Sequence, residues 1–272
     1  MSEPDLYRIR DFVPDFDRIA AELAARSRAT LARRSLRLAY GSRPREHVDI
    51  LFPDAPAAGA PLHMFVHGGY WRSGDIASWS CAVEPVLAAG GIAAVCEYDL
   101  MPGTRLAAIV DQVRSAARRV LAEAPGLGAD PARFTASGHS AGAHLASYLA
   151  AAAPGETEAP GIDVNGLLLV SGIYDLSGIP DSFLKAEAEM TPDEAAAFSP
   201  LTSRHTAGPL RIITRGGDET APFHDQATAL AECVGDEVEL RSEPGRNHMD
   251  VVLALSDVGH PLGRRLADLA AG

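Results

Sequence analysis

The stretch that most constrains the fold is a tight turn between a short apolar run and a helix-like run. It reads Gly138-His139-Ser140-Ala141-Gly142, with Phe-Thr-Ala-Ser before it and Ala-His-Leu after it. A Gly-x-Ser-x-Gly sequence in this context is typical of the turn that lifts a nucleophilic serine above the edge of a sheet. We expect Ser140 at strained φ/ψ, and glycines where strand and helix cross too closely for a Cβ. An ordinary glycine-rich turn can carry the same letters, so the rest of the chain must decide.

Around this turn, apolar strand-like runs alternate with amphipathic helix-like runs over all 272 residues. The expected strands lie at 37–40, 47–52, 62–66, 92–98, 133–136, 164–170, 210–214 and 237–241. The expected helices lie at 15–34, 75–90, 105–124, 141–153, 223–234, 250–255 and 261–270. This alternation predicts an α/β fold whose mainly parallel central sheet has helices on both faces.

The length fits one α/β domain over residues 1–272. Residues 1–36 predict an N-terminal helical segment that lies over the domain, near the mouth of the site. Residues 176–208 break the rhythm, because prolines divide them into short helical pieces. We expect this segment to be a small cap inserted over the site.

Composition limits the partners and the compartment. The formal net charge of −12 argues against nucleic acid and anionic membranes. No run of about 18 apolar residues predicts a transmembrane helix, and the first residues lack a signal-peptide pattern. Cys81, Cys96 and Cys233 are far apart, which is typical of buried thiols in a reducing compartment. We therefore expect a cytoplasmic protein with a small-molecule substrate; the oligomeric state is not determined by the sequence.

Ser140 needs a base, since a free hydroxyl is a poor nucleophile at neutral pH. His248 follows the last predicted strand, where the chain order serine, acid, histidine places the base. A loop histidine is usually only a surface residue, but this order favours the catalytic role. His260 is the second choice. His144 lies one turn below Ser140 on the next helix, and we expect it to pack or to form a hydrogen bond.

The acid of such a triad must follow the strand at 210–214. Asp218 and Glu219 stand next to each other there, so their side chains diverge and one of them reaches His248. Asp is the commoner residue in this role and Glu an accepted variant, so spacing leaves the choice open. The other carboxylate would be a solvated loop charge or a helix N-cap.

Backbone N–H groups are expected to bind the oxyanion of the reaction. Ala141 follows the nucleophile directly, and Gly68 and Gly69 lie in the loop after an early strand. One such donor typically stabilises a transition state by about 3 kcal/mol. The alternative for the loop is an ordinary Gly-Gly turn. The neighbouring Tyr70 and Trp71 are expected to line the substrate pocket.

No set of His, Cys, Asp or Glu shows the spacing of metal ligands, and no phosphate-binding glycine motif is present. We therefore expect neither a metal nor a cofactor.

Together, these motifs resemble the kynurenine formamidase (arylformamidase) branch of the α/β-hydrolases, close to the hormone-sensitive-lipase-like esterases. The resemblance rests on residues 67–71, on residues 138–145 and on an opening hairpin at residues 40–41 and 48–53. It implies an α/β-hydrolase fold that hydrolyses a small N-formyl arylamide or carboxylic ester without a cofactor. Esterases and formamidases share these motifs, so the substrate stays open.

The resemblance also bears on the acid and the base. The segment 219–223, with Gln226 after it, is similar to the family's acid segment, in which the carboxylate stands four residues before a Phe. This implies Glu219 rather than Asp218. The segment from His248 to Val252 is similar to the segment that carries the base, with Met249 where the family usually has Phe.

The leading hypothesis is a serine hydrolase that works through an acyl-enzyme, either a formamidase or a carboxylesterase. The alternative is a non-catalytic ligand-binding protein with an α/β-hydrolase fold. Such proteins usually lack a member of the triad, whereas all three candidates are present here. The sequence therefore favours the enzyme.

Overall fold

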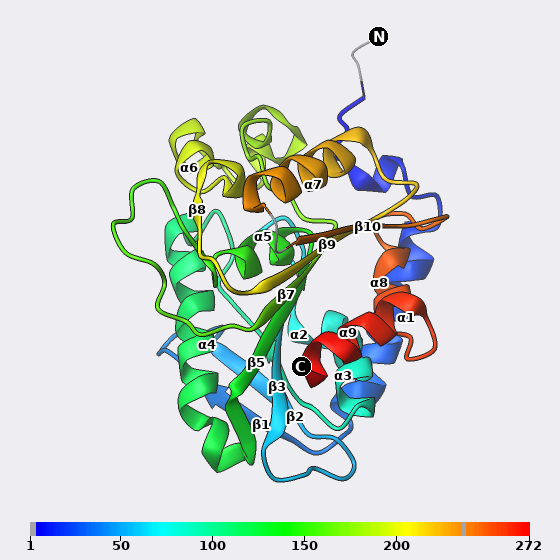
Figure 1. Ribbon diagram of the computed structural model, residues 1–272. Coiled ribbons are helices and arrows are strands. Elements are labelled where there is room, and N and C mark those ends of the chain that lie inside the picture. Colours follow the sequence, from blue (N-terminus) through cyan, green and yellow to red (C-terminus); the bar gives the residue numbers. More distant parts are fainter. Residues whose placement is uncertain (1–3, 236–237) are drawn as a thin grey trace.

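The computed structural model describes residues 4–235 and 238–272 of the chain, which form a central sheet between two layers of helices (Figure 1). The strands of this sheet are β1 (Ser35–Ala39), β2 (His47–Leu51), β3 (Ala60–Val66), β4 (Ile92–Cys96), β5 (Ala129–His139), β7 (Gly166–Val170), β9 (Leu210–Gly216) and β10 (Val238–Glu243). Glu237, where the sequence placed the start of the last strand, lies outside the described residues.

The order of the strands is β1-β2-β4-β3-β5-β7-β9-β10. The pairs β1–β2 and β2–β4 are antiparallel, and the remaining pairs are parallel. The predicted α/β fold with a mainly parallel sheet is therefore confirmed. Because parallel strands end at the same edge, the loops after β3, β5, β7, β9 and β10 gather there.

Helices cover both faces of the sheet. They are α1 (Phe16–Leu31), α2 (Ile76–Trp79), α3 (Glu84–Ala88), α4 (Leu106–Leu127), α5 (Ala141–Ser147), α6 (Pro192–Ala197), α7 (Ala221–Val234), α8 (Asp250–Ser256) and α9 (Pro261–Ala271). In Figure 1, α4, α5 and α7 lie on one side of the sheet, and α1, α3, α8 and α9 lie on the other. Shorter 3-10 turns are η1 (Ile9–Asp11), η2 (Ser80–Val83), η3 (Ile179–Asp181), η4 (Phe183–Ala186) and η5 (Pro200–Thr202).

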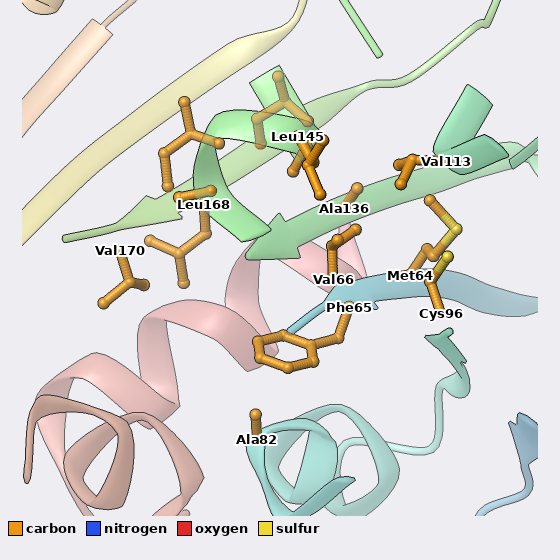
Figure 2. Packing of buried hydrophobic residues seen from close by; sticks show 14 of the residues in the cluster. Met64, Phe65, Val66, Ala82, Cys96, Val113, Ala136, Leu145, Leu168 and Val170 are labelled. Carbon is orange, nitrogen blue, oxygen red and sulfur yellow. The ribbon is translucent and has the colours of Figure 1, made fainter. Parts of the chain in front are cut away.

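The core lies on both faces of the central strands, in which nearly every residue is buried. Successive side chains of a strand point to opposite faces, so the apolar runs of β3, β4 and β7 supply both layers. Figure 2 shows Phe65 pointing toward Ala82 on one side, while Val113 and Leu145 lie on the other. This double burial fixes the strand ends that carry the site.

The helix predicted over residues 75–90 is wrong, because the structure divides it into α2, η2 and α3. The N–H of Cys81 donates to the hydroxyl of Ser27 on α1 (3.1 Å) instead of continuing a helix. Pro85, near the start of α3, has no N–H to offer. A contact with a distant helix therefore overrides the local helical pattern.

The helix after the turn is shorter than predicted: α5 ends at Ser147, not near residue 153. Arg114 of α4 donates to the carbonyl oxygens of Tyr148 (3.0 Å) and Ala151 (2.8 Å). These carbonyls would otherwise accept the next helical hydrogen bonds. The chain instead forms β6 (Ala151–Ala152), which pairs with β8 (Arg204–His205).

Two further predictions concern cysteines and membranes. Cys81 and Cys96 are buried as expected, but Cys233 near the end of α7 is exposed, so its prediction as a buried thiol is wrong. The apolar face of α7 is carried by other residues, including Phe223 and Leu230. None of the helices in the described part of the chain is long and apolar enough to span a membrane.

Candidate active site

The turn between β5 and α5 has the strained geometry that the sequence predicts. Ser140 has φ 55° and ψ −122°, outside the regions that non-glycine residues usually occupy. A Cβ on Gly142 would lie 2.1 Å from the carbonyl oxygen of Val66, and one on Gly138 would lie 2.3 Å from that of Gly142. Only glycines therefore fit at these two positions, and the strand, the helix and β3 hold Ser140 in place.

Ser140, His248 and Glu219 form one chain of hydrogen bonds, although they lie far apart in the sequence. His248 Nδ1 lies 2.9 Å from Glu219 Oε2, and His248 Nε2 lies 3.0 Å from Ser140 Oγ. A carboxylate only accepts, so Nδ1–H donates to Glu219 and Nε2 is left to accept from the Ser140 hydroxyl. All three side chains are almost fully buried. This arrangement makes the serine hydroxyl ready to lose its proton to His248.

The carboxylate that faces His248 belongs to Glu219, whereas the neighbouring Asp218 is exposed to solvent. The second oxygen of Glu219 accepts from the Ser171 hydroxyl (2.5 Å) and from the backbone N–H of Gly216 (2.6 Å). Ser171 stands at the end of β7 with φ 52°. The sequence did not identify Ser171 as a site residue; its only signal was its place directly after a predicted strand.

The loop after β3 lies against the nucleophile. A Cβ on Gly68 would be 3.3 Å from the Cβ of Ser140, and Gly69 has φ 126°, which favours glycine. Ala141 is the first residue of α5. Gly68 and Ala141 therefore lie next to Ser140, and Gly69 lines the same cavity; their role as donors to an oxyanion stays a prediction.

Buried polar side chains stabilise the backbone of this loop. The ring of Tyr98 stacks on the ring of His67, with centroids 4.3 Å apart, and its hydroxyl donates to the His67 carbonyl (2.8 Å). His67 Nε2 lies 3.1 Å from Glu97, which also pairs with Arg45. These contacts cross from β3 to β4 and to the loop before β2, so they fix the backbone that approaches Ser140.

His139 is a second residue that the sequence did not single out. Its Nε2 donates to the carbonyl of His248 (2.8 Å), and its ring stacks on Trp79 with centroids 5.2 Å apart. Burial lowers the pKa of His139 well below its usual range, and the nearby His248 ring acts in the same direction. A neutral His139 therefore holds the backbone of His248, the candidate base.

A cavity of 530 Å³ opens above Ser140 and His248. Most of its other lining residues come from η1, α1, the loop after β3 and η4. They include Ile9, Phe16, Ala20, Leu23, Tyr70 and Phe183, together with Trp79 of α2 and Met249 next to His248. The expectation that the N-terminal helix lies near the mouth of the site is confirmed. Tyr70 lines the cavity, as the sequence predicts.

Trp71 does not line the cavity, which corrects its prediction as a substrate-binding residue. Its side chain is fully buried, and its indole N–H donates to Nδ1 of His144 (3.1 Å). Tyr70 and Trp71 both have a positive φ (54° and 58°), and within this turn the side chain of Trp71 is buried in the core while Tyr70 lines the cavity. Adjacent residues in a strained loop point in different directions.

The two other histidines considered as bases have structural partners. His144 accepts from Trp71 and contacts the carbonyl of Phe198 (2.8 Å), which confirms the expected hydrogen-bonding role. Burial lowers the pKa of His144 to about 4. His260 accepts from the N–H of Leu262 (3.1 Å) at the start of α9. Within the described ranges, no group of three or more His, Cys, Asp or Glu is arranged to hold a metal ion.

Comparisons with known proteins agree with this geometry. The BD-FAE family model matches residues 48–232, which is more than half of the chain. A kynurenine formamidase of Salmo salar is 26% identical over 245 residues, covering 87% of this chain and 82% of the relative. The predicted resemblance to the formamidase and esterase branch is thereby confirmed.

Solved structures give the same result for the fold. A putative thioesterase from Silicibacter sp. TM1040 is 27% identical, covers 100% of both chains and superposes with a TM-score of 0.83. A thermostable carboxylesterase cloned from a metagenomic library is 20% identical, covers 94% of this chain and 95% of its own, and has a TM-score of 0.71. The second likeness speaks for the α/β-hydrolase fold alone.

Proposed function

The chain belongs to the BD-FAE family, and we propose that Ser140, His248 and Glu219 are the catalytic triad with which it cleaves a small carboxylic ester or N-formyl arylamide. Its likeness to esterases and formamidases identifies it as a serine hydrolase of that type. The observation that carries the proposal is the continuous hydrogen-bonded chain from the Ser140 hydroxyl through His248 to Glu219.

In the first step of the proposed reaction, Ser140 Oγ attacks the carbonyl carbon of the substrate. Its proton moves to His248 Nε2, which lies 3.0 Å away. Glu219 keeps Nδ1 protonated and stabilises the imidazolium that forms. The backbone N–H groups of Gly68, Gly69 and Ala141 would donate to the oxyanion, where charge develops.

In the following steps, His248 returns the proton to the leaving amine or alcohol, and the acyl group stays on Ser140. A water molecule then attacks this acyl-enzyme, with His248 again taking the proton. His248 then gives this proton to Ser140 Oγ as the acyl bond breaks, which releases a carboxylic acid and restores the Ser140 hydroxyl. Each proton in this scheme is carried by His248, so the scheme needs no cofactor.

The size of the cavity suits a small substrate with an aromatic leaving group. The 530 Å³ space is lined by Phe16, Tyr70, Trp79 and Phe183, which offer apolar walls to a flat ring. Formamides and short esters both meet this requirement. We propose that residues 176–208 act as a small cap on one domain that spans residues 1–272, since Phe183 and Glu187 reach the cavity.

The proposal includes the setting of the enzyme. The formal net charge of −12 and the spread of the three cysteines support a cytoplasmic protein that acts on free small molecules. In this proposal the protein binds neither nucleic acid nor membranes.

A substrate panel tests the proposed function. Turnover of N-formylkynurenine is compared with that of p-nitrophenyl acetate and butyrate by kcat/KM, and a fluorophosphonate probe tests the reactivity of Ser140. We expect labelling at Ser140 and turnover of at least one of these classes. Ester turnover without formamide turnover would remove the formamidase alternative. A protein that binds these compounds and neither reacts with the probe nor cleaves them would be the ligand-binding alternative.

A further inference from the structure

Three arginine side chains line the cavity, although the chain as a whole is acidic. Arg8, Arg10 and Arg72 share the cavity with Ser140, and the carboxylates of Asp11 and Glu187 accompany them. The formal net charge of the chain is −12, so cations are in the minority elsewhere. The partners of each arginine decide which of them is free to bind a ligand.

Arg10 has the closer partners of the two arginines on the N-terminal segment. Its Nη1 donates to Asp17 (2.8 Å), and its guanidinium lies 4.4 Å from the centre of the Phe16 ring. Arg8 is held more loosely, because its Nε lies 4.0 Å from Asp11 in a pair whose side chains are more than half exposed. A pair of this length in solvent contributes little, so Arg8 can turn to another anion.

Arg72 has an unused donor inside the protein. One end of its guanidinium pairs with Glu187, but its Nε is buried and has no hydrogen-bond partner among the described residues. A guanidinium presents two parallel N–H groups that fit the two oxygens of a carboxylate. A buried donor without an acceptor costs free energy, which a ligand with an acceptor oxygen would recover.

Arg8 and Arg72 reach the same turn of the chain. The guanidinium of Arg8 lies 5.1 Å from the centre of the Phe183 ring, and Arg72 pairs with Glu187 just after η4. Tyr70 connects the two, since its ring packs edge-on against Phe183 (5.2 Å) and its hydroxyl donates to the carbonyl of the residue before Arg8. The two arginines therefore line the same part of the cavity wall, next to η4.

We propose that Arg72, with Arg8 beside it, forms an anion subsite, and that the substrate carries a carboxylate in addition to its scissile carbonyl. This inference rests on the proposed function, because it assigns a substrate class to the cavity of Ser140. Arg72 is a specificity residue in this scheme and takes no part in bond breaking. It selects anionic aryl esters or formamides over their neutral counterparts.

Matched substrate pairs test the subsite. The pairs are 4-acetoxybenzoate with phenyl acetate, and 4-formamidobenzoate with formanilide, assayed with the wild type, Arg72→Met and Arg72→Lys. We expect Arg72→Met to lower kcat/KM for the carboxylated member about tenfold or more, with the neutral member within twofold. Arg72→Lys keeps the positive charge but lacks the paired N–H groups of the guanidinium, so it should recover part of the lost kcat/KM. Salt should reduce the wild-type preference.

Arg10→Met is the matched control, since Arg10 lines the same cavity but, unlike Arg72, has no buried donor without a partner within the described ranges. Equal losses on both members of a pair in Arg72→Met, or the same selective loss in Arg10→Met, would overturn the subsite. Binding to Ser140→Ala separates this inference from the proposed function. If the wild type cleaves neither these pairs nor the substrates of the earlier panel, the proposed function fails. Calorimetry of 4-acetoxybenzoate with Ser140→Ala and with Ser140→Ala/Arg72→Met then decides the subsite: a weaker Kd in the second supports it and equal values refute it.

Discussion

The side of the cavity around Ser140 and the side formed by the N-terminal segment are held by different kinds of contact. Around Ser140, the strand ends are buried, and the glycines contact neighbouring backbone so closely that a Cβ would not fit. The side chains there are therefore held in one position. On the other side, residues 5–11 bury Ile9 and otherwise attach through individual hydrogen bonds. Examples are those from the Thr220 hydroxyl to the Leu6 carbonyl (2.8 Å) and from the Phe183 N–H to the Asp5 carboxylate (2.5 Å). Ion pairs there are largely exposed.

This difference separates reaction from selection. Reacting groups must be held within a few tenths of an ångström, and the packed edge of a sheet provides that precision. A substrate wall can be built from segments whose side chains change without disturbing the sheet. Substitutions near Ser140 should therefore change kcat, whereas substitutions on the N-terminal side should change KM. The four predictions below test this division, from the largest expected effect to the smallest.

Loss of the proposed nucleophile should have the largest effect. Ser140→Ala removes the attacking oxygen, and we expect kcat to fall about 10⁶-fold on any substrate that the wild type cleaves. The free energy of unfolding should stay level or rise, because the hydroxyl is replaced by a smaller apolar group at a strained position. Steady-state kinetics and urea unfolding measure the two quantities. Turnover that persists in Ser140→Ala would contradict the mechanism.

Loss of the proposed acid should have the second-largest effect on kcat. Glu219→Gln keeps the shape but replaces the carboxylate that orients His248 Nδ1–H, and we expect kcat to fall about 10³- to 10⁴-fold. Asp218→Asn is the matched control, since Asp218 is adjacent and exposed. Its kcat should stay within twofold of the wild type. Equal effects of the two substitutions would mean that the choice of Glu219 over Asp218 is wrong.

Ser171 should contribute less, because it acts through Glu219. Ser171→Ala removes one of two donors to Glu219 Oε1 and leaves the Gly216 N–H in place. We expect kcat to fall about tenfold with KM unchanged, since a hydrogen bond to a charged group is at stake. Ser171→Thr, which restores a hydroxyl, should recover part of the rate.

Ser147→Ala gives the comparison for Ser171. It also removes one buried hydroxyl, but Ser147 donates to the His144 carbonyl (2.6 Å) and does not line the cavity. We expect a similar loss of stability and no loss of kcat. A rate lost equally in both variants would make Ser171 a general packing residue.

The sequence predicted the Ser140 side of the cavity far better than the other side. Ser140 and His248 follow from a turn motif and from chain order, because the carboxyl ends of parallel strands must meet at one edge. Glu219 needed the resemblance to a family, since spacing did not separate it from Asp218. Ser171 has no motif, and only the pairing of β7 with β9 brings it to the acid.

The remaining errors have tertiary causes that no local pattern contains. The predicted helix at residues 75–90 is divided by a contact from Cys81 to Ser27, 54 positions away in the sequence. Trp71 was expected at the cavity, but its side chain is buried and its indole N–H donates to His144, 73 positions away in the sequence. Arg72 gave no signal in the sequence, because its meaning depends on Glu187 and on a buried Nε.

The smallest effect is expected from the hydroxyl of Tyr70, which contacts the N-terminal segment. Tyr70→Phe keeps the ring against Phe183 and removes the hydrogen bond to the Tyr7 carbonyl. Because one neutral hydrogen bond is lost, we expect about 1 kcal/mol less free energy of unfolding and a KM that rises a few fold. The value of kcat should stay within twofold.

Tyr148→Phe is the control, since the Tyr148 hydroxyl is hydrogen-bonded to Ser203 (2.9 Å) and does not line the cavity. This variant should lose stability without a change in KM. A large fall in kcat for Tyr70→Phe would show that the N-terminal side takes part in the reaction, and the division between the two sides of the cavity would then fail.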